Sequence, residues 1–325
     1  MPITISGGVQ LSGPVLLDPT GGSSPTPGGG GGASNFGYTV GGFTGGDYSN
    51  VIDKFSFSSD ANATDVGDTI GTPMGSAGQS SSTHGYNSGS GGPSDSSGKV
   101  QKFAFASDGN ASDVGSLTVK RGTLPAGGSS STSGYTAGGR APSTGISSVI
   151  DKFPFASDDN ATDVGDLATG VQDAAGQSSS DNGYVSTGET TPGNVNIIQK
   201  YSFASDGNAS DVGDNTATRD SAAGQSSSTH GYTSGGYIAP NNFRVDIIDK
   251  FPFASDGNAT DVGDLSLGRR QLAGTSSSAS GYNAGGNREP GMPNEIDKFS
   301  FSSDANATDV GDLTQARSHA SGAQY

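Results

Sequence analysis

Short segments in which apolar and polar residues alternate recur along this chain and predict β-strands. The clearest is segment 53–57, Asp-Lys-Phe-Ser-Phe, in which the Asp and both Phe share one face and the Lys and Ser share the other. Successive side chains of a strand point to opposite faces, so this alternation is typical of a half-buried strand. No helical spacing of apolar residues competes with it, and we therefore expect an all-β fold.

The same aromatic segment occurs six times. Its first aromatic residue stands at positions 55, 103, 153, 201, 251 and 299, so successive copies are 48 or 50 residues apart. Each copy is followed by an Asp-rich turn and a run of small residues, and each unit also has a Gly-Tyr pair. A period near 48 with four short segments per unit is typical of a propeller blade. We predict a six-bladed β-propeller with four antiparallel strands per blade, small residues at its centre and Phe pairs between adjacent blades.

The two ends of the chain supply parts of one unit. The sixth unit stops before any Gly-Tyr segment, whereas the Gly-Tyr segment at 36–42 has no complete unit before it. We therefore expect the N-terminal strand to pair with the C-terminal blade and close the ring, which removes exposed strand edges. In this division residues 36–325 form the propeller, residues 18–35 a Gly/Pro/Ser linker and residues 1–17 a docking peptide.

The docking peptide is predicted from a concentration of apolar residues ahead of a flexible tract. Its apolar residues are Ile3, Ile5, Val9, Leu11, Val15, Leu16 and Leu17. The linker that follows contains five consecutive glycines, which favour a flexible tether. Such a peptide could add a strand to the sheet edge of a partner, and a disordered tail is the alternative.

Composition on its own argues against a folded core. The 325 residues include 55 Gly and 15 Pro, carry a net charge of −16 and contain only about 16% Leu, Ile, Val and Phe, which is typical of disordered chains. The repeat changes this interpretation because it assigns glycine to turns and closely packed strands. No apolar stretch is long enough to predict membrane insertion. Nucleic acid is not an expected partner either, because phosphate binding needs a basic surface.

The connections between strands fall into two classes. In an up-and-down blade, the turns joining strands one to two and three to four lie on one side of the disc, and the other connections lie on the opposite side. Together with the last strand, the first class is nearly identical in all units and holds 19 acidic residues and no basic one. The second class differs in every unit and carries all eight arginines. We call these two sides of the disc the constant side and the variable side.

The variable side is the candidate binding face, because arginine and aromatic residues favour binding surfaces. The candidate residues are Arg121, Arg140, Tyr237, Phe243, Arg244, Arg269, Arg270 and Arg288. The alternative is that these loops vary because nothing constrains them.

The Asp-rich turns resemble the beginning of a calcium-binding loop. In the fifth unit Asp256, Asn258, Thr260 and Asp261 place oxygen-bearing side chains at the first, third, fifth and sixth positions. The Glu that completes a helix-loop-helix calcium site is missing from the turn, and Asp, Gly and Asn also favour tight turns. Calcium is the only cofactor that the sequence raises, and a plain turn is the alternative. We find no nucleophile elbow, phosphate-binding loop or isolated carboxylate pair, so we do not expect an enzyme.

The order of the segments resembles the blade of kelch-type propellers, in which a small-residue strand precedes a double-glycine strand and an aromatic strand. The units depart from that family because they lack its Trp. Two double glycines are also imperfect, at Gly89-Ser90 and Thr187-Gly188, and the aromatic and Asp residues follow a different order. The resemblance covers residues 36–325 and implies a propeller without transferring any catalytic residue.

Two longer segments resemble repeats in structural proteins of marine cyanophages. They are Gly-Gln-Ser-Ser-Ser-Thr-His-Gly-Tyr and Asp-Lys-Phe-Pro-Phe-Ala-Ser-Asp. The resemblance implies a non-enzymatic protein on the virion surface, either a head decoration or part of a tail fibre. Its N-terminus would bind other virion proteins of the capsid or tail, and its disc would contact host surface polysaccharide or a neighbouring virion protein. A calcium-dependent carbohydrate-binding module and an extracellular scaffold or filament subunit are the alternatives.

Overall fold

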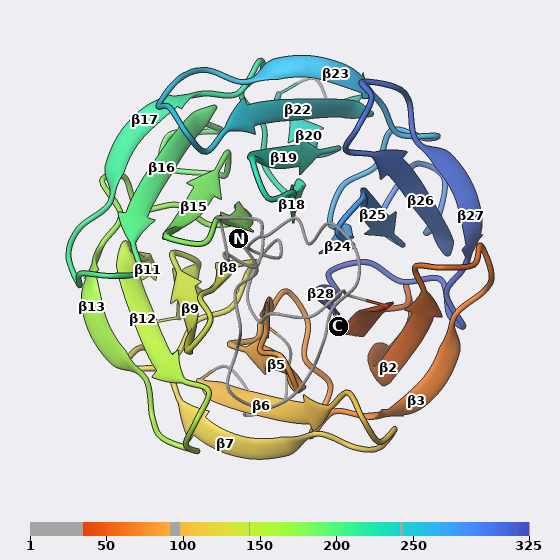
Figure 1. Cartoon of the computed structure of the whole chain (residues 1–325), viewed down its shortest axis with the longest axis horizontal. Coiled ribbons are helices and arrows are strands. Elements are labelled where there is room, and N and C mark those ends of the chain that lie inside the picture. Colours follow the sequence, from red (N-terminus) through yellow and green to blue (C-terminus); the bar gives the residue numbers. More distant parts are fainter. Residues whose placement is uncertain (1–34, 92–97, 143, 241–242, 325) are drawn as a thin grey trace, which may run out of the picture.

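Six four-stranded antiparallel sheets surround a central axis and form a disc (Figure 1). This computed structural model describes residues 35–91, 98–142, 144–240 and 243–324. The secondary structure of these residues consists of strands and turns without a helix. The predicted all-β, six-bladed propeller with four antiparallel strands per blade is confirmed.

The strands form four layers from the axis to the rim. The innermost strands are β28 (Ser321–Gln324), β4 (Ala77–Ser80), β8 (Ala126–Ser129), β14 (Ala175–Ser178), β18 (Ala223–Ser226) and β24 (Ala273–Ser276). The second strands are β1 (Phe36–Phe43), β5 (His84–Ser88), β9 (Ser133–Ala137), β15 (Asn182–Ser186), β19 (His230–Ser234) and β25 (Ser280–Ala284). The third strands are β2 (Tyr48–Ser56), β6 (Lys99–Ala104), β12 (Val149–Pro154), β16 (Ile197–Ser202), β22 (Ile247–Pro252) and β26 (Glu295–Ser300). The outer strands are β3 (Thr64–Asp68), β7 (Ser112–Ser116), β13 (Thr162–Asp166), β17 (Ser210–Asp214), β23 (Thr260–Asp264) and β27 (Thr308–Asp312).

The blades are numbered in the order of those strands, so blade 1 contains β28, β1, β2 and β3. In blade 1, β28 comes from the C-terminal end of the chain and pairs with β1 from Gly37↔Gln324 to Val40↔Ser321. This pairing confirms the predicted closure of the ring. Two short hairpins extend the variable side, β10 (Arg140–Ala141) with β11 (Gly145–Ile146) in blade 3, and β20 (Tyr237–Ile238) with β21 (Phe243–Arg244) in blade 5.

Backbone contact at the axis leaves room only for glycine. The second residue of each inner strand is a glycine, and together these six residues form the glycine ring, Gly78, Gly127, Gly176, Gly224, Gly274 and Gly322. A Cβ on any of them would lie 2.0 to 2.4 Å from the carbonyl oxygen of the glycine in the neighbouring blade. Real Cβ atoms essentially never come within 3.0 Å of such an atom. The blades can therefore meet at the axis only because this residue lacks a side chain.

Serine hydroxyls join the inner strands on the constant side of the glycine ring. The Oγ of Ser129 accepts a hydrogen bond of 3.0 Å from the backbone N–H of Ser80. The same bond, at 2.9 to 3.0 Å, runs from Ser129 to Ser178, Ser178 to Ser226, Ser226 to Ser276 and Gln324 to Ser80. The sixth unit has Gln324 in place of this serine, so no Oγ is present there to accept the remaining bond.

Aromatic rings fill the space between blades. The tyrosine of each second strand lies against the second Phe of the next blade, with ring centroids 4.5 to 5.0 Å apart, as Tyr232 does against Phe301. The Gly before the tyrosine is required because a Cβ on Gly231 would lie 2.3 Å from the ring of Phe251 in the adjacent strand. The predicted packing of Phe pairs between blades is confirmed, and the hydrophobic core consists of six small clusters.

The glycine ring can be tested with Gly176→Ala. The added Cβ would lie 2.1 Å from the Gly127 carbonyl oxygen, so we expect the free energy of unfolding to fall by about 3 kcal/mol, at the upper end for overpacking. Urea unfolding measures this loss. Gly109→Ala is the control, because its Cβ would meet no atom within 4 Å and should change stability by less than about 0.5 kcal/mol. Equal stability of the two variants would contradict a backbone-limited axis.

Candidate functional site

Four of the eight arginines are completely buried. Arg121, Arg219, Arg269 and Arg317 are each 0% exposed. Each lies in the connection between two blades, and its Nη2 is 2.9 to 3.1 Å from an Asp Oδ2 on the third strand of the following blade, in the pairs Arg121–Asp151, Arg219–Asp249, Arg269–Asp297 and Arg317–Asp53. The assignment of Arg121 and Arg269 to the binding face is therefore wrong, because both guanidinium groups are inside the disc.

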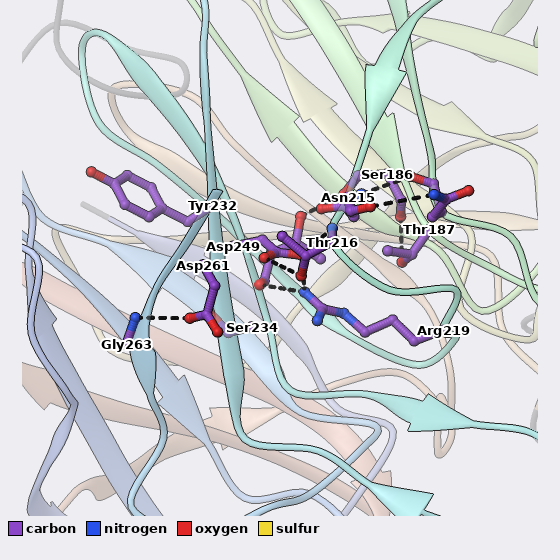
Figure 2. A network of polar contacts seen from close by, with 12 residues as sticks. Ser186, Thr187, Asn215, Thr216, Arg219, Tyr232, Ser234, Asp249, Asp261 and Gly263 are labelled. Carbon is purple, nitrogen blue, oxygen red and sulfur yellow. Dashed lines mark hydrogen bonds and ion pairs between the residues drawn. The ribbon is translucent and has the colours of Figure 1, made fainter. Parts of the chain in front are cut away.

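The pair of blade 5 shows how such a charge is held (Figure 2). Nη2 of Arg219 also donates to the carbonyl oxygen of Thr233 at 2.9 Å. The Asp249 carboxylate accepts hydrogen bonds from the backbone N–H and the hydroxyl of Thr216 at 3.0 and 2.7 Å. Burial lowers the pKa of Arg219, and its attraction to Asp249 offsets part of this shift. Because neither charge reaches water, the loss of one partner would leave the other charge buried and unpaired.

Two blades replace the charged pair with a neutral one. Blade 2 has Gln101 in place of the Asp, and the connection that leads into it has Pro73 in place of the Arg. Blade 4 has Gln199 in place of the Asp, and the connection that leads into it has Val171 in place of the Arg. Gln199 accepts a hydrogen bond of 2.8 Å from the N–H of Thr169 and donates one of 3.0 Å to its carbonyl oxygen. Arg and Asp are therefore replaced together, which means that these arginines maintain the fold. An alignment of the six units would have revealed this paired replacement from the sequence.

The other candidate residues remain on the variable side. Arg140 and Phe243 are exposed, whereas Tyr237, Arg244, Arg270 and Arg288 are half-buried. The guanidinium of Arg270 lies 4.6 Å from the centre of the Tyr237 ring. In the same region Arg244 donates to Asn287 at 3.1 to 3.2 Å and forms an ion pair of 2.9 Å with Glu289. Tyr237, Arg244 and Arg270 therefore belong to one patch over blades 5 and 6.

The candidate calcium ligands have other partners. Asp256 forms an ion pair of 2.5 Å with Lys200, and the Oδ1 of Asn258 accepts the Asp214 N–H at 3.0 Å, so both bind the preceding blade. Asp261 accepts the N–H of Gly263 at 3.2 Å, and Thr260 is exposed at the start of β23. Within the ranges that the structure describes, no group of three or more His, Cys, Asp or Glu side chains could hold a metal ion. Calcium binding stays a hypothesis without a contact to support it.

A ring of backbone hydrogen bonds on the variable side was not predicted. It joins one residue from each connection between blades, and we call these six residues the mouth ring, Gly75, Thr123, Asp173, Ser221, Gln271 and His319. All six have φ between 53° and 63°. The backbone N–H of each ring residue donates a hydrogen bond of 2.7 to 3.1 Å to the carbonyl oxygen of the ring residue in the preceding connection. In one connection Leu124, the residue after Thr123, is the donor, and it bonds the carbonyl oxygen of Gly75 at 2.8 Å.

The mouth ring holds side chains in a conformation that favours glycine. A left-handed backbone costs an ordinary residue on the order of 1 kcal/mol, and only blade 2 avoids this cost by using Gly75. The units differ at this position, just before the small-residue run. This variation between the units is the only sign of the mouth ring in the sequence. It does not predict a positive φ, because Thr, Asp, Ser, Gln and His share no motif that favours this conformation.

A small cavity of about 80 Å³, to which mostly polar surface is exposed, lies between the mouth ring and the glycine ring. We call it the throat. The residues that follow the mouth ring line it, among them Leu124, Ala174, Ala222, Leu272 and Ala320. A second cavity of about 60 Å³, on the constant side of the glycine ring, is lined by the inner serines with Gln79 and Gln177. The surface exposed along the axis is therefore mostly polar on both sides of the glycine ring.

Comparison with known proteins adds no assignment. No model of a known protein family matches the chain, and no curated protein matches it significantly. The described part of the chain contains no helix that is long and apolar enough to cross a membrane. The predicted docking residues, Ile3 to Leu17, lie outside the described part of the chain, so the docking peptide stays a prediction.

The buried arginine can be tested with Arg219→Val. This change leaves the Asp249 carboxylate buried without its ion pair, so we expect a loss of about 3–5 kcal/mol in the free energy of unfolding, measured by urea unfolding. Adding Asp249→Gln reproduces the Val171 and Gln199 pair of blade 4 and should recover most of the loss. Arg140→Val, at an exposed site, serves as the control. If the double variant were no more stable than the single one, the two positions would not form a pair.

Proposed function

We propose that this protein is a non-enzymatic binding protein on the surface of a phage particle, whose propeller presents its variable side to a partner. One observation carries this proposal. Among the described residues the exposed large apolar side chains are Tyr48, Ile70 and Phe243. Tyr48 begins β2 at the variable side, and Ile70 and Phe243 belong to connections on that side. Phe243, at 65% exposed, stands on the hairpin of β20 and β21. All three lie on the variable side, which makes that side the candidate interaction surface.

The constant side has a different task, because its side chains hold neighbouring blades together. Six lysines of the third strands pair with the first Asp of the turn in the next blade at 2.5 to 3.0 Å. In the same turns six asparagines accept the backbone N–H of the last outer-strand residue of the preceding blade at 3.0 to 3.1 Å. Ring contacts therefore account for the uniform constant side, and the variable side is left to meet a partner.

Host surface polysaccharide is the partner that the chemistry favours. Arg140 and Phe243 are exposed, and Arg270 is held against Tyr237. Arginine binds carboxylate groups through paired hydrogen bonds, and an aromatic ring offers an apolar face, so this set suits an acidic polysaccharide. The placement on a virion rests on the resemblance to structural proteins of marine cyanophages and on the kelch-like order of the segments.

A glycan array with the full-length protein tests the binding face. We expect binding to acidic glycans, and the double variant Phe243→Ser with Arg140→Ser should weaken it at least tenfold. Asp181→Ser, in an exposed turn of the constant side, is the matched control and should bind normally. Binding abolished by a chelator would favour the calcium-dependent carbohydrate-binding module. Self-association in sedimentation without glycan binding would favour the scaffold or filament subunit.

Removal of residues 1–17 tests attachment to the particle. Because the propeller begins with β1 at Phe36, the truncated protein should fold and melt at the same temperature as the full chain. We expect it to be missing from purified particles when the truncated gene replaces the original one, as measured by mass spectrometry of the virion. Incorporation at the normal level would exclude a docking role for this segment.

A further inference from the structure

A pocket of about 430 Å³ opens on the variable side beside blade 1. One wall is the turn between β1 and β2, and the other is the connection from β27 to β28, at Gln315 and Ala316. Blade 6, which contains β27, is next to blade 1 in the ring (Figure 1). Pockets that bind small molecules have volumes of about 300–1,000 Å³, so this one has room for a ligand.

The hairpin of blade 1 forms this pocket because it is longer than its equivalents. β1 has eight residues and β2 has nine, whereas the second and third strands of the other blades have five and six. Two backbone hydrogen bonds of 2.8 and 2.9 Å join Phe43, at the end of β1, to Ser318 of the connection. In the turn, the hydroxyl of Thr44 donates to the carbonyl oxygen of Asp47 at 2.9 Å. The walls are therefore in place before a ligand arrives, which lowers the entropy cost of binding.

A buried ion pair supports the pocket from inside. Ser49 lines the pocket and is 5% exposed. Its hydroxyl accepts a hydrogen bond of 3.3 Å from Arg317, the arginine that pairs with Asp53. The same hydroxyl donates to Oε1 of Gln315 at 3.1 Å. Because Oε1 is the acceptor in this bond, the amide nitrogen of Gln315 is the group that can donate to a ligand.

Tyr48 gives the pocket an aromatic ring that the fold does not require. The residue is 38% exposed, and the centroid of its ring lies 5.4 Å from that of Phe43. Tyr48 stands five residues before the Asp or Gln of the third strand, where the other units have Ser96, Ile146, Asn194, Arg244 and Met292. None of these is aromatic, so the propeller forms without a ring at this position.

The polar groups of the pocket match hydroxyl groups. Among the described residues that line it, Asp47 is acidic and none is basic. Asp47 is exposed, and its carboxylate makes no hydrogen bond or ion pair with any residue in the described ranges. A carboxylate only accepts hydrogen bonds and an amide N–H only donates them, whereas a hydroxyl does both. A ligand with several hydroxyl groups can therefore bond Asp47 and Gln315 together.

We propose that this pocket binds one neutral sugar residue, with a C–H face of the sugar ring against Tyr48. One sugar hydroxyl donates to the Asp47 carboxylate, and another accepts from the amide of Gln315. The tyrosine ring supplies a broad apolar surface, which suits the C–H groups on one face of a sugar. Asp47 disfavours acidic sugars, because like charges repel.

An organic cation is the competing ligand, because an aromatic ring and a carboxylate also attract an ammonium group. A quaternary ammonium has no acceptor for the amide N–H of Gln315, which would lose its bond to water without a replacement. A sugar replaces that bond and also satisfies Asp47. The chemistry of the pocket therefore favours the sugar.

The site goes beyond the proposed function. Its residues belong to blade 1 and the connection that leads into it, whereas Arg140 and Phe243 belong to the short hairpins in blades 3 and 5. The earlier set suits acidic groups, and this pocket suits neutral ones. Each binding activity can therefore be lost without the other.

Ligand-observed NMR titration of the full-length protein tests the pocket. The probes are the methyl α-glycosides of glucose, galactose and mannose, which differ only in the orientation of single hydroxyl groups. The methyl α-glycoside of glucuronic acid and tetramethylammonium chloride are the charged comparisons. We expect at least one neutral glycoside to bind at least tenfold more tightly than either charged probe.

Variants of the pocket assign the binding to its residues. Tyr48→Ser and Asp47→Asn should each lower the affinity for the neutral glycoside at least tenfold. Tyr48→Phe keeps the ring and is the matched control, so it should bind normally. Asp47→Asn changes an exposed residue of a turn and should melt at the temperature of the unaltered protein, which shows that its loss of binding does not come from unfolding.

A crossed comparison separates this proposal from the acidic-glycan site. Phe243→Ser with Arg140→Ser should keep the binding of the neutral glycoside, and Tyr48→Ser should keep the binding of acidic glycans. The proposal would be overturned if none of the three neutral glycosides bound or if tetramethylammonium bound more tightly than all of them. Equal affinity of Tyr48→Ser and the unaltered protein for the neutral glycoside would overturn it as well.

Discussion

The close approach of six inner strands at one axis is the constraint on which the whole disc depends. At Gly78 and its five equivalents a carbonyl oxygen of the neighbouring blade occupies the space of a Cβ, so this position of every inner strand must be glycine. The apolar content is therefore concentrated between blades, where each tyrosine lies against two rings of the next blade, as Tyr184 does against Phe251 and Phe253. A chain with the composition of a disordered protein can fold because close backbone packing replaces bulky side chains.

Repetition of one blade-to-blade contact explains why the two sides of the disc differ. Each blade meets its neighbours through the same groups, so a change in the Lys–Asp pair or in the turn asparagine would weaken a joint between blades. The connections on the variable side are held by their buried Arg or the residue that replaces it, as Arg317 is held by Asp53, and by the backbone hydrogen bonds of the mouth ring, and their other positions are free to differ. Uniformity on the constant side is thus a property of the fold, and it leaves variation to the opposite side.

The features that the sequence predicted are the ones that repeat in register. The propeller and its closure follow from the period and from the incomplete units at the two ends. Burial of Arg121 could not be predicted from composition, because its partner Asp151 is 30 residues away on a strand that looks like part of the aromatic segment. The mouth ring was missed for another reason, since a positive φ at Thr123 or Gln271 has no signature in the residue type.

Departures from the repeat are informative only when their compensation is known. Gly128 stands where the inner strands of blades 2, 4 and 5 have Gln, and Tyr201 replaces Phe. The Tyr201 hydroxyl lies 2.4 Å from the position of a Cβ on Gly128, so one change makes room for the other. Val171 and Gln199 compensate each other in the same manner. Asp173 departs from the repeat without any partner in the described residues. A departure therefore acquires a structural meaning only when the residue that offsets it is found, as Gln199 is for Val171 and Tyr201 is for Gly128.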